Sequence, residues 1–272
     1  AGAHRIFEVL DTQPEIVDPP EAIVLADIEG RVDFCDVDFS YIAGIPVLEK
    51  FDLHVSAGET IALVGHTGAG KTSVTALVNR SYDIQQGEIL IDGHDLRSIQ
   101  RASLTSRMSV VLQEPYLFSG SIRENIRYGR LNATNEEVEI AAKAVGADDF
   151  ISQLPADYST ILHERGRNVS VGQRQLIAFA RALVADPRIL ILDEATANVD
   201  TQTEKLIQRA LETMLQGRTS FVIAHRLSTI RNADRIVMMQ LGKIVEIGNH
   251  DELMQLDGAY ADLYKMTFAN AN

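Results

Sequence analysis

Two periodicities of hydrophobic residues run along the chain and predict an alternation of strands and helices. Apolar and polar residues alternate in residues 32–39 and again in residues 47–55, which predicts an antiparallel pair of strands. Residues 60–64 are almost entirely apolar, so this segment is expected to be a buried strand. Residues 87–91 predict a further strand, which leads into an Asp-Gly turn. The first third of the chain is therefore expected to be rich in strands.

Helical periodicity dominates the middle of the chain. Thr134 and Glu137 have the spacing of a capping box, which opens a helix that Gly146 would close. A second helix with one apolar face is expected after Gly172, and it continues through Leu183.

The order of these elements predicts the fold and the domain organisation. A buried strand at residues 189–192 is followed by alternating helices and strands. This order predicts an α/β fold with a mainly parallel sheet, an N-terminal antiparallel β-subdomain and an α-helical subdomain inserted at about residues 115–185. Residues 31–268 are expected to form this domain, and residues 269–272 a short tail.

The first 30 residues are expected to lie outside the domain. The segment Arg5–Leu10 is amphipathic, and Pro14, Pro19 and Pro20 follow it among acidic residues, which is typical of an extended linker. The chain begins at Ala1 and not at Met, so we expect it to be part of a larger protein. Residues 1–30 are thus predicted to be the end of a helix and a linker.

A glycine-rich segment lies between the strand at residues 60–64 and a helix-compatible run, and it has the pattern of a phosphate-binding P-loop. Its glycines let backbone N–H groups turn toward an anion, and the following helix presents its positive end to the same phosphates. Lys71 would reach the β- and γ-phosphates, and the Thr72 hydroxyl would ligate Mg²⁺. The expected nucleotide-binding residues here are Gly65, His66, Thr67, Gly68, Ala69, Gly70, Lys71, Thr72 and Ser73. The fold is accordingly predicted to contain a P-loop NTPase core.

Two carboxylates end the buried strand at residues 189–192. The carboxyl ends of strands are where α/β sheets place ligand chemistry, so Asp193 is expected to hold Mg²⁺ together with Thr72. Glu194 would then act as the general base toward the attacking water. Taken alone, the pair could equally be a polar strand end, but its combination with a P-loop favours the catalytic interpretation.

Composition and charge exclude several classes of protein. The chain has 272 residues, of which 46% are hydrophobic and 23% charged, which is typical of a globular protein. Its net charge of −13 argues against a nucleic-acid partner but not against a nucleotide, since a P-loop binds phosphate with backbone dipoles, one lysine and a metal. The single cysteine, Cys35, excludes an intrachain disulfide. No apolar run has the length of a membrane helix.

Several further motifs resemble those of the ABC ATPase family, in the family's order, over about residues 31–268. Residues 169–175 resemble the signature sequence, and residues 192–196 resemble the Walker B strand. Gln113 resembles the Q-loop glutamine, residues 198–200 resemble the D-loop, and His225 resembles the switch histidine. The resemblance implies binding and hydrolysis of ATP with Mg²⁺.

The resemblance also implies roles for individual residues. Gln113 would contact the metal or the water, and His225 would donate to the γ-phosphate. Tyr41 matches the adenine-stacking aromatic residue of the family. In the family, the signature of one subunit closes on ATP held by another, so a second nucleotide-binding domain is implied as a partner. The residues that would contact the nucleotide across this dimer are Ser170, Gly172, Gln173 and Asp200.

One residue departs from the signature pattern. Val171 occupies a position where the family most often has glycine, and a β-branched residue restricts the backbone. Ser170, Gly172 and Gln173 are retained, so the anion-binding turn is expected to function. The strength of the contact with the partner's nucleotide is left open by this substitution.

Two features indicate the exporter subfamily. The segment Glu164–Gly166 resembles the element that contacts the membrane domain of ABC exporters, and the segment Arg5–Leu10 with its linker resembles the connection from their last membrane helix. The resemblance implies a fused transmembrane domain, contacted through the Gln113 loop and residues 164–166, and a location at the cytoplasmic face of the membrane.

Two other functions are weighed against an exporter ATPase. A soluble ABC ATPase acting on DNA or ribosomes is the main alternative, although the acidic charge balance and the short interval between Lys71 and Gly172 disfavour it. A P-loop GTPase or small kinase would leave residues 169–175 unexplained. The transported substrate and the choice between homodimer and heterodimer are not encoded in the motifs of this chain.

Overall fold

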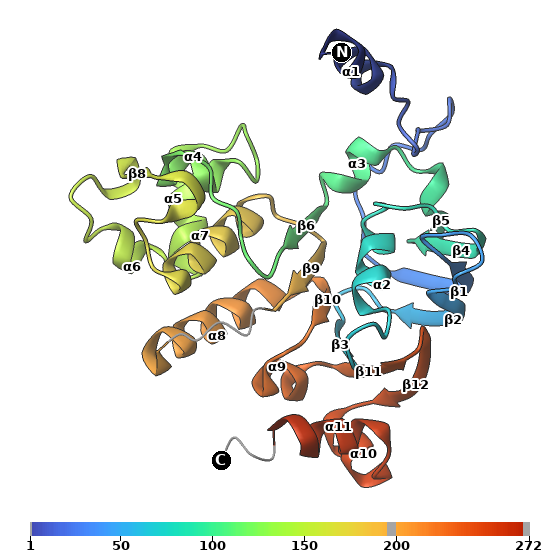
Figure 1. Ribbon diagram of the computed structural model, residues 1–272. Coiled ribbons are helices and arrows are strands. Elements are labelled where there is room, and N and C mark those ends of the chain that lie inside the picture. The colour runs from blue at the N-terminus through green and yellow to red at the C-terminus, as the bar shows by residue number, and fades with distance from the viewer. Residues whose placement is uncertain (1, 195–199, 269–272) are drawn as a thin grey trace.

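A largely parallel sheet lies at the centre of the computed structural model, which describes residues 2–194 and 200–268 (Figure 1). Its strands are β3 (Thr60–Val64), β6 (Met108–Val111), β9 (Ile189–Asp193), β10 (Thr219–Ile223), β11 (Arg235–Gln240) and β12 (Lys243–Gly248). The order is β12-β11-β3-β10-β9-β6, with parallel pairing from β11 to β6 and an antiparallel pair of β11 with β12 at one edge. The predicted mainly parallel sheet is confirmed.

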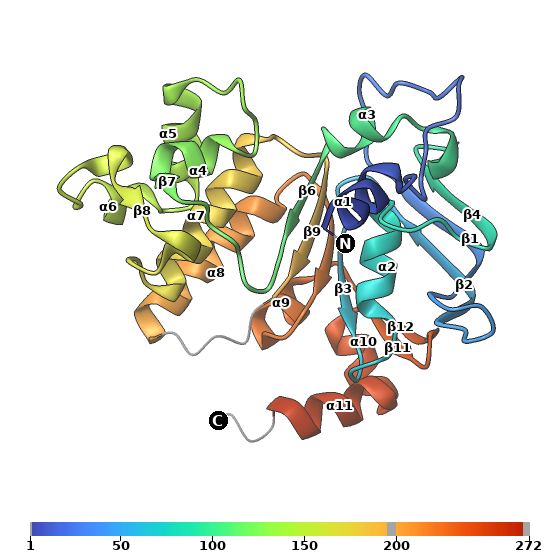
Figure 2. The same cartoon turned by 45° about the horizontal axis from the view of Figure 1, so that its top comes forward.

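A second, antiparallel sheet is built from the N-terminal strands. These are β1 (Val32–Phe39), β2 (Leu48–Val55), β4 (Gln86–Ile91) and β5 (His94–Asp95), in the order β2-β1-β4-β5. Helix α2 (Lys71–Val78) lies between this sheet and the parallel sheet (Figure 2). The predicted antiparallel β-subdomain is thereby confirmed, and it covers one face of the P-loop helix.

The buried parallel strands supply side chains to two separate hydrophobic cores. In β3, Ile61 and Leu63 point toward α2 and the antiparallel sheet, whereas Ala62 and Val64 belong to the core on the opposite face. This follows from the period of two in a strand that is buried on both sides. Such strands read as continuous apolar runs, which is why residues 60–64 could be predicted as buried from the sequence.

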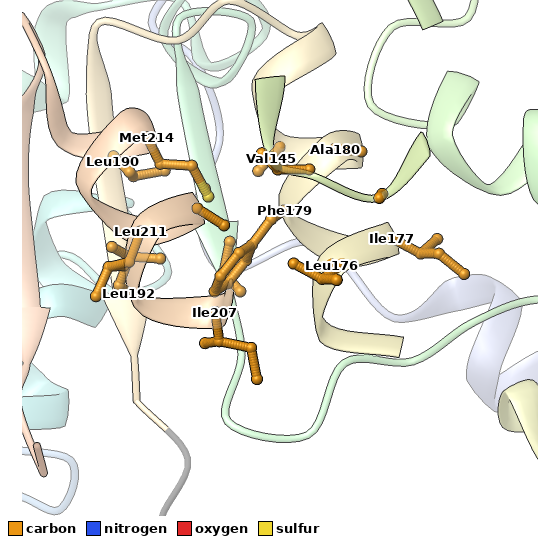
Figure 3. Packing of buried hydrophobic residues seen from close by; sticks show 14 of the residues in the cluster. Val145, Leu176, Ile177, Phe179, Ala180, Leu190, Leu192, Ile207, Leu211 and Met214 are labelled. Carbon is orange, nitrogen blue, oxygen red and sulfur yellow. The ribbon is translucent and has the colours of Figure 1, made fainter. Parts of the chain in front are cut away.

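The second core joins the helices to the parallel sheet. Helices α7 (Val171–Val184) and α8 (Thr201–Leu215) pack there against β9, and Figure 3 shows Phe179 of α7 pointing toward Ile207 and Leu211 of α8. Leu192 of β9 lies in the same cluster, next to the two carboxylates that end the strand. The helix that begins at the signature segment is therefore anchored on the strand that carries Asp193.

A group of helices lies to one side of the sheet, as predicted for an inserted helical subdomain (Figure 1). Its helices are α4 (Ile122–Arg127), α5 (Asn135–Ala144), α6 (Asp148–Ile151) and α7, with 3₁₀ turns at Asp157–Ser159 and Glu164–Gly166. The capping box of Thr134 and Glu137 is confirmed, and Gly146 follows α5 with φ +70°. The short pair β7 (Gly120–Ser121) and β8 (Ile161–Leu162) was not predicted, because two-residue strands have no detectable periodicity.

The remaining elements surround the two sheets. They are α1 (Gly2–Asp11), a 3₁₀ turn at Leu96–Ser98, α3 (Arg101–Thr105), α9 (Leu227–Asn232), α10 (His250–Leu256) and α11 (Ala259–Phe268). Among the helices of the described residues, none combines the length and the apolar character that crossing a membrane requires.

The second half of the predicted linker is attached to the domain. Ile23 forms an isolated parallel bridge with Ile99. The Asp92 carboxylate accepts hydrogen bonds from the backbone N–H groups of residues 29–31, at 2.8 to 3.1 Å for the shortest contact of each. The polar backbone of this segment thus finds partners on the turn between β4 and β5 and on the chain before α3, which a prediction from composition did not anticipate.

Candidate nucleotide-binding site

The P-loop connects β3 to α2, and two of its glycines are required by close contacts. Gly65 has φ +147°, and a Cβ there would lie 2.3 Å from the carbonyl oxygen of Met239 in β11. Gly70 precedes α2 with φ +100°, and a Cβ there would lie 3.0 Å from Leu48 Cδ2. Only glycine permits this backbone, so the loop is held between the edge of the parallel sheet and β2.

Lys71 curls back over the loop. Its Nζ donates hydrogen bonds to the carbonyl oxygens of Gly65 and His66, at 2.7 and 3.0 Å. Burial lowers the pKa of Lys71, and the nearby Asp193 carboxylate acts in the opposite direction. The ammonium group therefore lies within the field of a carboxylate at the mouth of the loop, where a phosphate would bind.

Asp193 ends β9 at the same edge of the sheet. The strand lies between β10 and β6, and Asp193 is paired in register with Ile223, two residues before His225. Burial raises the pKa of Asp193, whereas the charges of His225 and Lys71 lower it. The structure thus brings Lys71, Asp193 and His225, which are far apart in the sequence, within electrostatic reach of one another.

Glu194 is buried, with 6% of its surface exposed. Its Oε2 accepts hydrogen bonds from the backbone N–H groups of His225 and Arg226, each at 3.0 Å, and its Oε1 accepts one from the Thr229 hydroxyl at 2.5 Å. A buried carboxylate is costly unless donors surround it, and these three donors supply that compensation. The predicted general base is therefore attached to the segment that carries the predicted switch histidine.

His225 and Gln113 have exposed side chains. His225 follows Ala224 beyond the end of β10, as a ligand-facing residue would. Gln113 lies two residues beyond β6, whose Val111 pairs in register with Leu192. Both residues therefore lie just beyond the carboxyl ends of the parallel strands, on the same edge of the sheet as Asp193. Among the described residues, no hydrogen bond occupies either side chain, so both are available to a ligand.

The signature segment forms the N-terminus of α7. Ser170 is the N-cap, its Oγ accepts from the Gln173 N–H at 3.2 Å, and the Gln173 Oε1 accepts from the Ser170 N–H at 2.9 Å. The hydroxyl proton of Ser170 is not consumed by this capping box, because a hydroxyl can accept and donate at once. Val171 is 44% exposed, so its branched side chain does not belong to the core.

Gly172 has a packing role that the sequence does not reveal. A Cβ at this position would lie 2.2 Å from Thr203 Cγ2 of α8. The glycine therefore allows α7 and α8 to approach closely at the start of α7. The packing of α7 against α8 therefore explains a glycine at position 172 even without any contact between this residue and a nucleotide.

Asp200 is the N-cap of α8. Its carboxylate accepts hydrogen bonds from the N–H groups of Gln202 and Thr203, both at 3.0 Å. Hydrogen bonding, chiefly with Thr203, lowers the pKa of Asp200. The rest of the predicted D-loop, Asn198 and Val199, lies outside the described residues, as do Ala195 and Thr196 of the Walker B match.

Tyr41 is half-exposed beside the P-loop helix. Its ring makes edge contacts with Phe39 and Tyr82, at centroid distances of 4.8 and 4.9 Å. Its hydroxyl lies 3.0 Å from Ser73 Oγ, in the first turn of α2. The aromatic ring predicted to stack on a base is therefore held close to the loop predicted to bind the phosphates.

Several residues of the site region were missed by sequence reasoning. Arg181 of α7 donates to the carbonyl oxygens of Asn125 and Tyr116, each at 2.8 Å, and stacks over the rings of Phe118 and Tyr128. Burial lowers the pKa of Arg181. No sequence signal marks these contacts, because they join residues more than 50 positions apart.

The aromatic residues next to Arg181 are exposed and line a groove. Tyr116, Phe118 and Tyr128 are each at least 41% exposed. Together with Leu112 they border a groove of about 890 Å³ between the helical subdomain and β6. An exposed apolar surface of this kind is typical of an interaction site. Leu112, which lines the groove, directly precedes Gln113 in the chain.

The segment Glu164–Gly166 is hydrogen-bonded to the chain between Tyr116 and Phe118. Arg165 has φ +59°, and its N–H donates to the carbonyl oxygen of Leu117 at 3.1 Å. The side chains of Glu164 and Arg165 are exposed. The segment is therefore attached to the strip of chain that carries Tyr116 and Phe118.

Comparison with known proteins agrees with this geometry. The model of the family described as ABC transporter matches residues 48–197, more than half of the chain. An ATP-dependent lipid A-core flippase of Desulfotalea psychrophila is 50% identical over 266 residues, which cover 98% of this chain and 46% of the flippase. A fatty acid ABC transporter ATP-binding/permease protein of Mycobacterium bovis is 51% identical over 270 residues, which cover 99% of this chain and 42% of that protein.

A solved structure extends the comparison to three dimensions. The structure of a bacterial Atm1-family ABC exporter with ATP bound has a TM-score of 0.90 and 39% identity, and the match covers 98% of this chain and 46% of the exporter chain. The chain spans less than half the length of each of these relatives. Exporters and ATP-binding/permease proteins among the relatives favour the exporter interpretation over a soluble ATPase acting on DNA or ribosomes. The chain belongs to the ABC transporter family, as an ATP-binding, ATP-hydrolysing domain homologous to those of ABC exporters.

Proposed function

We propose that this chain hydrolyses ATP to ADP and phosphate at the strand-end edge of the parallel sheet, and that the hydrolysis drives export through a membrane domain. The observation that carries this proposal is the convergence of Lys71, Asp193 and the carboxylate of Glu194 at one edge, beside the P-loop. These are the groups that phosphoryl transfer requires for charge compensation, metal binding and activation of water.

Nucleotide binding follows from the loop and its neighbours. The backbone N–H groups of the P-loop and the N-terminus of α2 would surround the phosphates, and Lys71 would exchange its bonds with the Gly65 and His66 carbonyls for bonds to phosphate oxygens. The half-exposed ring of Tyr41 is in position to stack on the base, a contact typically worth ~1 to 3 kcal/mol.

The residues of the site fit Mg²⁺ bound together with the nucleotide. Among residues 2–194 and 200–268, no group of three His, Cys, Asp or Glu residues could hold a metal by itself. Mg²⁺ prefers one or two protein oxygens and the phosphates of its substrate, so Thr72, Asp193 and Gln113 match its chemistry without such a group. When bound, Mg²⁺ would neutralise the charge that develops on the phosphates.

The protein residues would divide the work of hydrolysis. Glu194 would accept a proton from the attacking water, a contribution typically worth about 10²- to 10⁴-fold in rate. His225 would donate a hydrogen bond to the γ-phosphate from its exposed position beyond β10. Because the His225 N–H is bonded to the Glu194 carboxylate, the two residues would act as one unit.

A second copy of the domain would complete the site. The capping box of Ser170 leaves its hydroxyl proton and the N-terminus of α7 free to bind an anion, and no described hydrogen bond joins Ser170 or Gln173 to the P-loop of the same chain. The partner's phosphates are the anion we assign to this turn. Ser170, Gly172, Gln173 and Asp200 would thus lie at the dimer interface.

The membrane domain would dock on the groove beside β6. The exposed residues Tyr116, Phe118 and Tyr128 offer it an apolar surface. Gln113 directly follows Leu112 of the groove, and the N–H of Arg165 is bonded to Leu117, which lies between Tyr116 and Phe118 in the chain. Arg181 ties this surface to α7, so displacement of the groove would move the signature turn. The domain would lie at the cytoplasmic face of the membrane.

The names of the relatives do not select a cargo. A lipid A-core flippase and a fatty acid transporter are nearly equally similar to this chain, at 50% and 51% identity. The residues that select cargo would lie in the membrane domain, so the proposed role of this chain is to supply the energy of ATP hydrolysis.

The variant Glu194→Gln tests the catalytic part of the proposal. It should bind ATP as the unmodified chain does and hydrolyse it at least about 100-fold more slowly, because the amide keeps the shape of the carboxylate but loses its basicity. Calorimetry with ATP and a phosphate-release assay measure the two properties. Hydrolysis at the unmodified rate would contradict the proposed base.

A further inference from the structure

The Glu194 carboxylate is restrained asymmetrically. Its Oε2 accepts two backbone N–H groups, from His225 and Arg226, whereas its Oε1 accepts only the side-chain hydroxyl of Thr229. A carboxylate offers about four lone-pair sites, so three are occupied and one remains on Oε1. The oxygen with the remaining site is therefore the one that Thr229 holds.

The rotation of the carboxylate depends on this hydroxyl. The last torsion of a glutamate side chain is broad, so packing alone fixes it poorly. Both Glu194 and Thr229 are only 6% exposed, so bulk solvent has little access to the contact between them. The two N–H groups fix Oε2, and the Thr229 hydroxyl is the described contact that sets where Oε1 points.

The hydroxyl of Thr229 forms this contact at the expense of its usual local partners. Thr229 occupies the first turn of α9, where a threonine hydroxyl commonly bonds to the backbone of its own helix. Here it donates instead to a carboxylate 35 positions away. Thr229 also belongs to the segment that begins with His225. A shift of this segment would therefore move the donors of both carboxylate oxygens together.

We propose that Thr229 is a positioning residue that holds the Glu194 carboxylate in its orientation for accepting a proton from water. This inference rests on the proposed role of Glu194 as the general base. Thr229 does not contact the substrate; it acts through Glu194. Fixed donors around a catalytic group reduce the reorganisation needed during reaction, so loss of this donor should slow the chemical step and leave ATP binding unchanged.

The test compares Thr229→Val, which removes the hydroxyl while keeping the shape, with Thr229→Ser, which keeps the hydroxyl. We expect Thr229→Val to lower kcat about tenfold or more, which corresponds to about 1.4 kcal/mol in the barrier, with the KM for ATP changed less than about twofold. Thr229→Ser should restore kcat to within about threefold of the unmodified chain. Thr213→Val in α8 is the matched control, because the Thr213 hydroxyl donates to its own helix at Arg209.

The possible results separate this inference from the proposed function. If Glu194→Gln is inactive while Thr229→Val keeps its kcat, the positioning role is wrong and the general base stands. If Thr229→Ser is as slow as Thr229→Val, the hydroxyl is not responsible and the inference is also overturned. If Glu194→Gln remains active, the proposed base itself fails. Thr229→Ala replaces the valine variant in the same comparison should the latter not fold.

Discussion

The candidate site has two sides, which hold their functional residues in different ways. The core side comprises the P-loop and the carboxyl ends of the parallel strands, and the helical side comprises α7 and the groove beside β6. On the core side, Lys71, Asp193 and Glu194 start from buried strands or from the helix between the two sheets, and Glu194 has three donors. On the helical side, Ser170 and Tyr116 lie on exposed surfaces. The difference is consistent with our proposal that the chemistry is prepared within one chain, whereas the helical side presents surfaces for partners.

The two sides are joined through α7. Its N-terminus carries the signature turn, and its middle packs through Phe179 on α8 and β9 (Figure 3). Arg181 is hydrogen-bonded to the carbonyl groups of Asn125 and Tyr116 beside the groove. A single helix thus connects the surface proposed for the membrane domain with the turn proposed for the partner's nucleotide. The following variants are expected to affect either the core side or this connection, in decreasing order of effect.

Lys71→Ala should disable the core side most strongly. Loss of a charged hydrogen-bond donor typically costs about 1.5 to 3 kcal/mol, so ATP affinity should fall about 10- to 100-fold. Isothermal titration calorimetry measures this change. Lys205→Ala on the exposed surface of α8 is the control and should bind ATP normally. Unchanged affinity of Lys71→Ala would contradict the assignment of the P-loop.

Arg181→Met should weaken the connection between α7 and the groove. The variant keeps an apolar stem but leaves the carbonyl groups of Asn125 and Tyr116 without their donor, so the free energy of unfolding should fall by about 2 to 3 kcal/mol. Urea denaturation measures the loss, and ATP binding at the P-loop should persist in the folded protein. Arg181→Lys, which keeps the charge but not the planar fork, should be intermediate.

A value for Arg181→Met within about 0.5 kcal/mol of the unmodified chain would show that these contacts contribute little to stability. Loss of ATP affinity equal to that of Lys71→Ala would instead indicate that Arg181 supports the core side. Either result would contradict the view that Arg181 stabilises the helical side without supporting nucleotide binding on the core side.

Gly172→Ala should separate α7 from α8 at the signature turn. The added Cβ would lie 2.2 Å from Thr203 Cγ2, and overpacking of this kind typically costs about 1 to 3 kcal/mol. The neighbouring Val171→Gly is the control: Val171 is 44% exposed, so the fold should be kept at a cost of less than about 1 kcal/mol. Thermal unfolding compares them. Equal stabilities would place the close contact of the two helices in doubt.

Glu164→Ala should have the smallest effect on this chain. Substitution of one exposed charge usually changes stability by less than about 0.5 kcal/mol, so folding and basal ATPase activity should be unchanged here. In a transporter that includes the membrane domain, the same change should reduce transport or its stimulation of ATP hydrolysis. Equal losses with and without the membrane domain would show that Glu164 supports the ATPase domain itself.

Local patterns predicted much of the fold and the elements that carry the candidate site. The buried strands at residues 60–64 and 189–192, the capping box of Thr134 and Glu137, and the position of the glycine-rich loop between a strand and a helix could be predicted, because each depends on neighbouring residues. The mainly parallel sheet with an antiparallel subdomain followed from their order. The roles of individual site residues remain predictions, which the proposed variants test.

The missed features depend on contacts between distant parts of the chain. The Thr229 hydroxyl meets Glu194 across 35 positions, and Arg181 meets Tyr116 across 65. The attachment of residues 29–31 to Asp92 spans more than 60 positions. None of these pairs leaves a periodic or motif-like trace, because the partners come together only when the sheets and helices pack.

The central claim is that a site prepared on the core side of one chain is completed by the signature turn of another, and its most direct test is the mass of Glu194→Gln in solution with ATP and Mg²⁺. Light scattering should report twice the mass of the 29.9 kDa chain, because trapped ATP would hold two copies together. Adding Ser170→Glu, which places a negative charge against the partner's phosphates, should return the particle to the mass of one chain. A strict monomer at high protein concentration, or a dimer that Ser170→Glu does not weaken, would contradict the account.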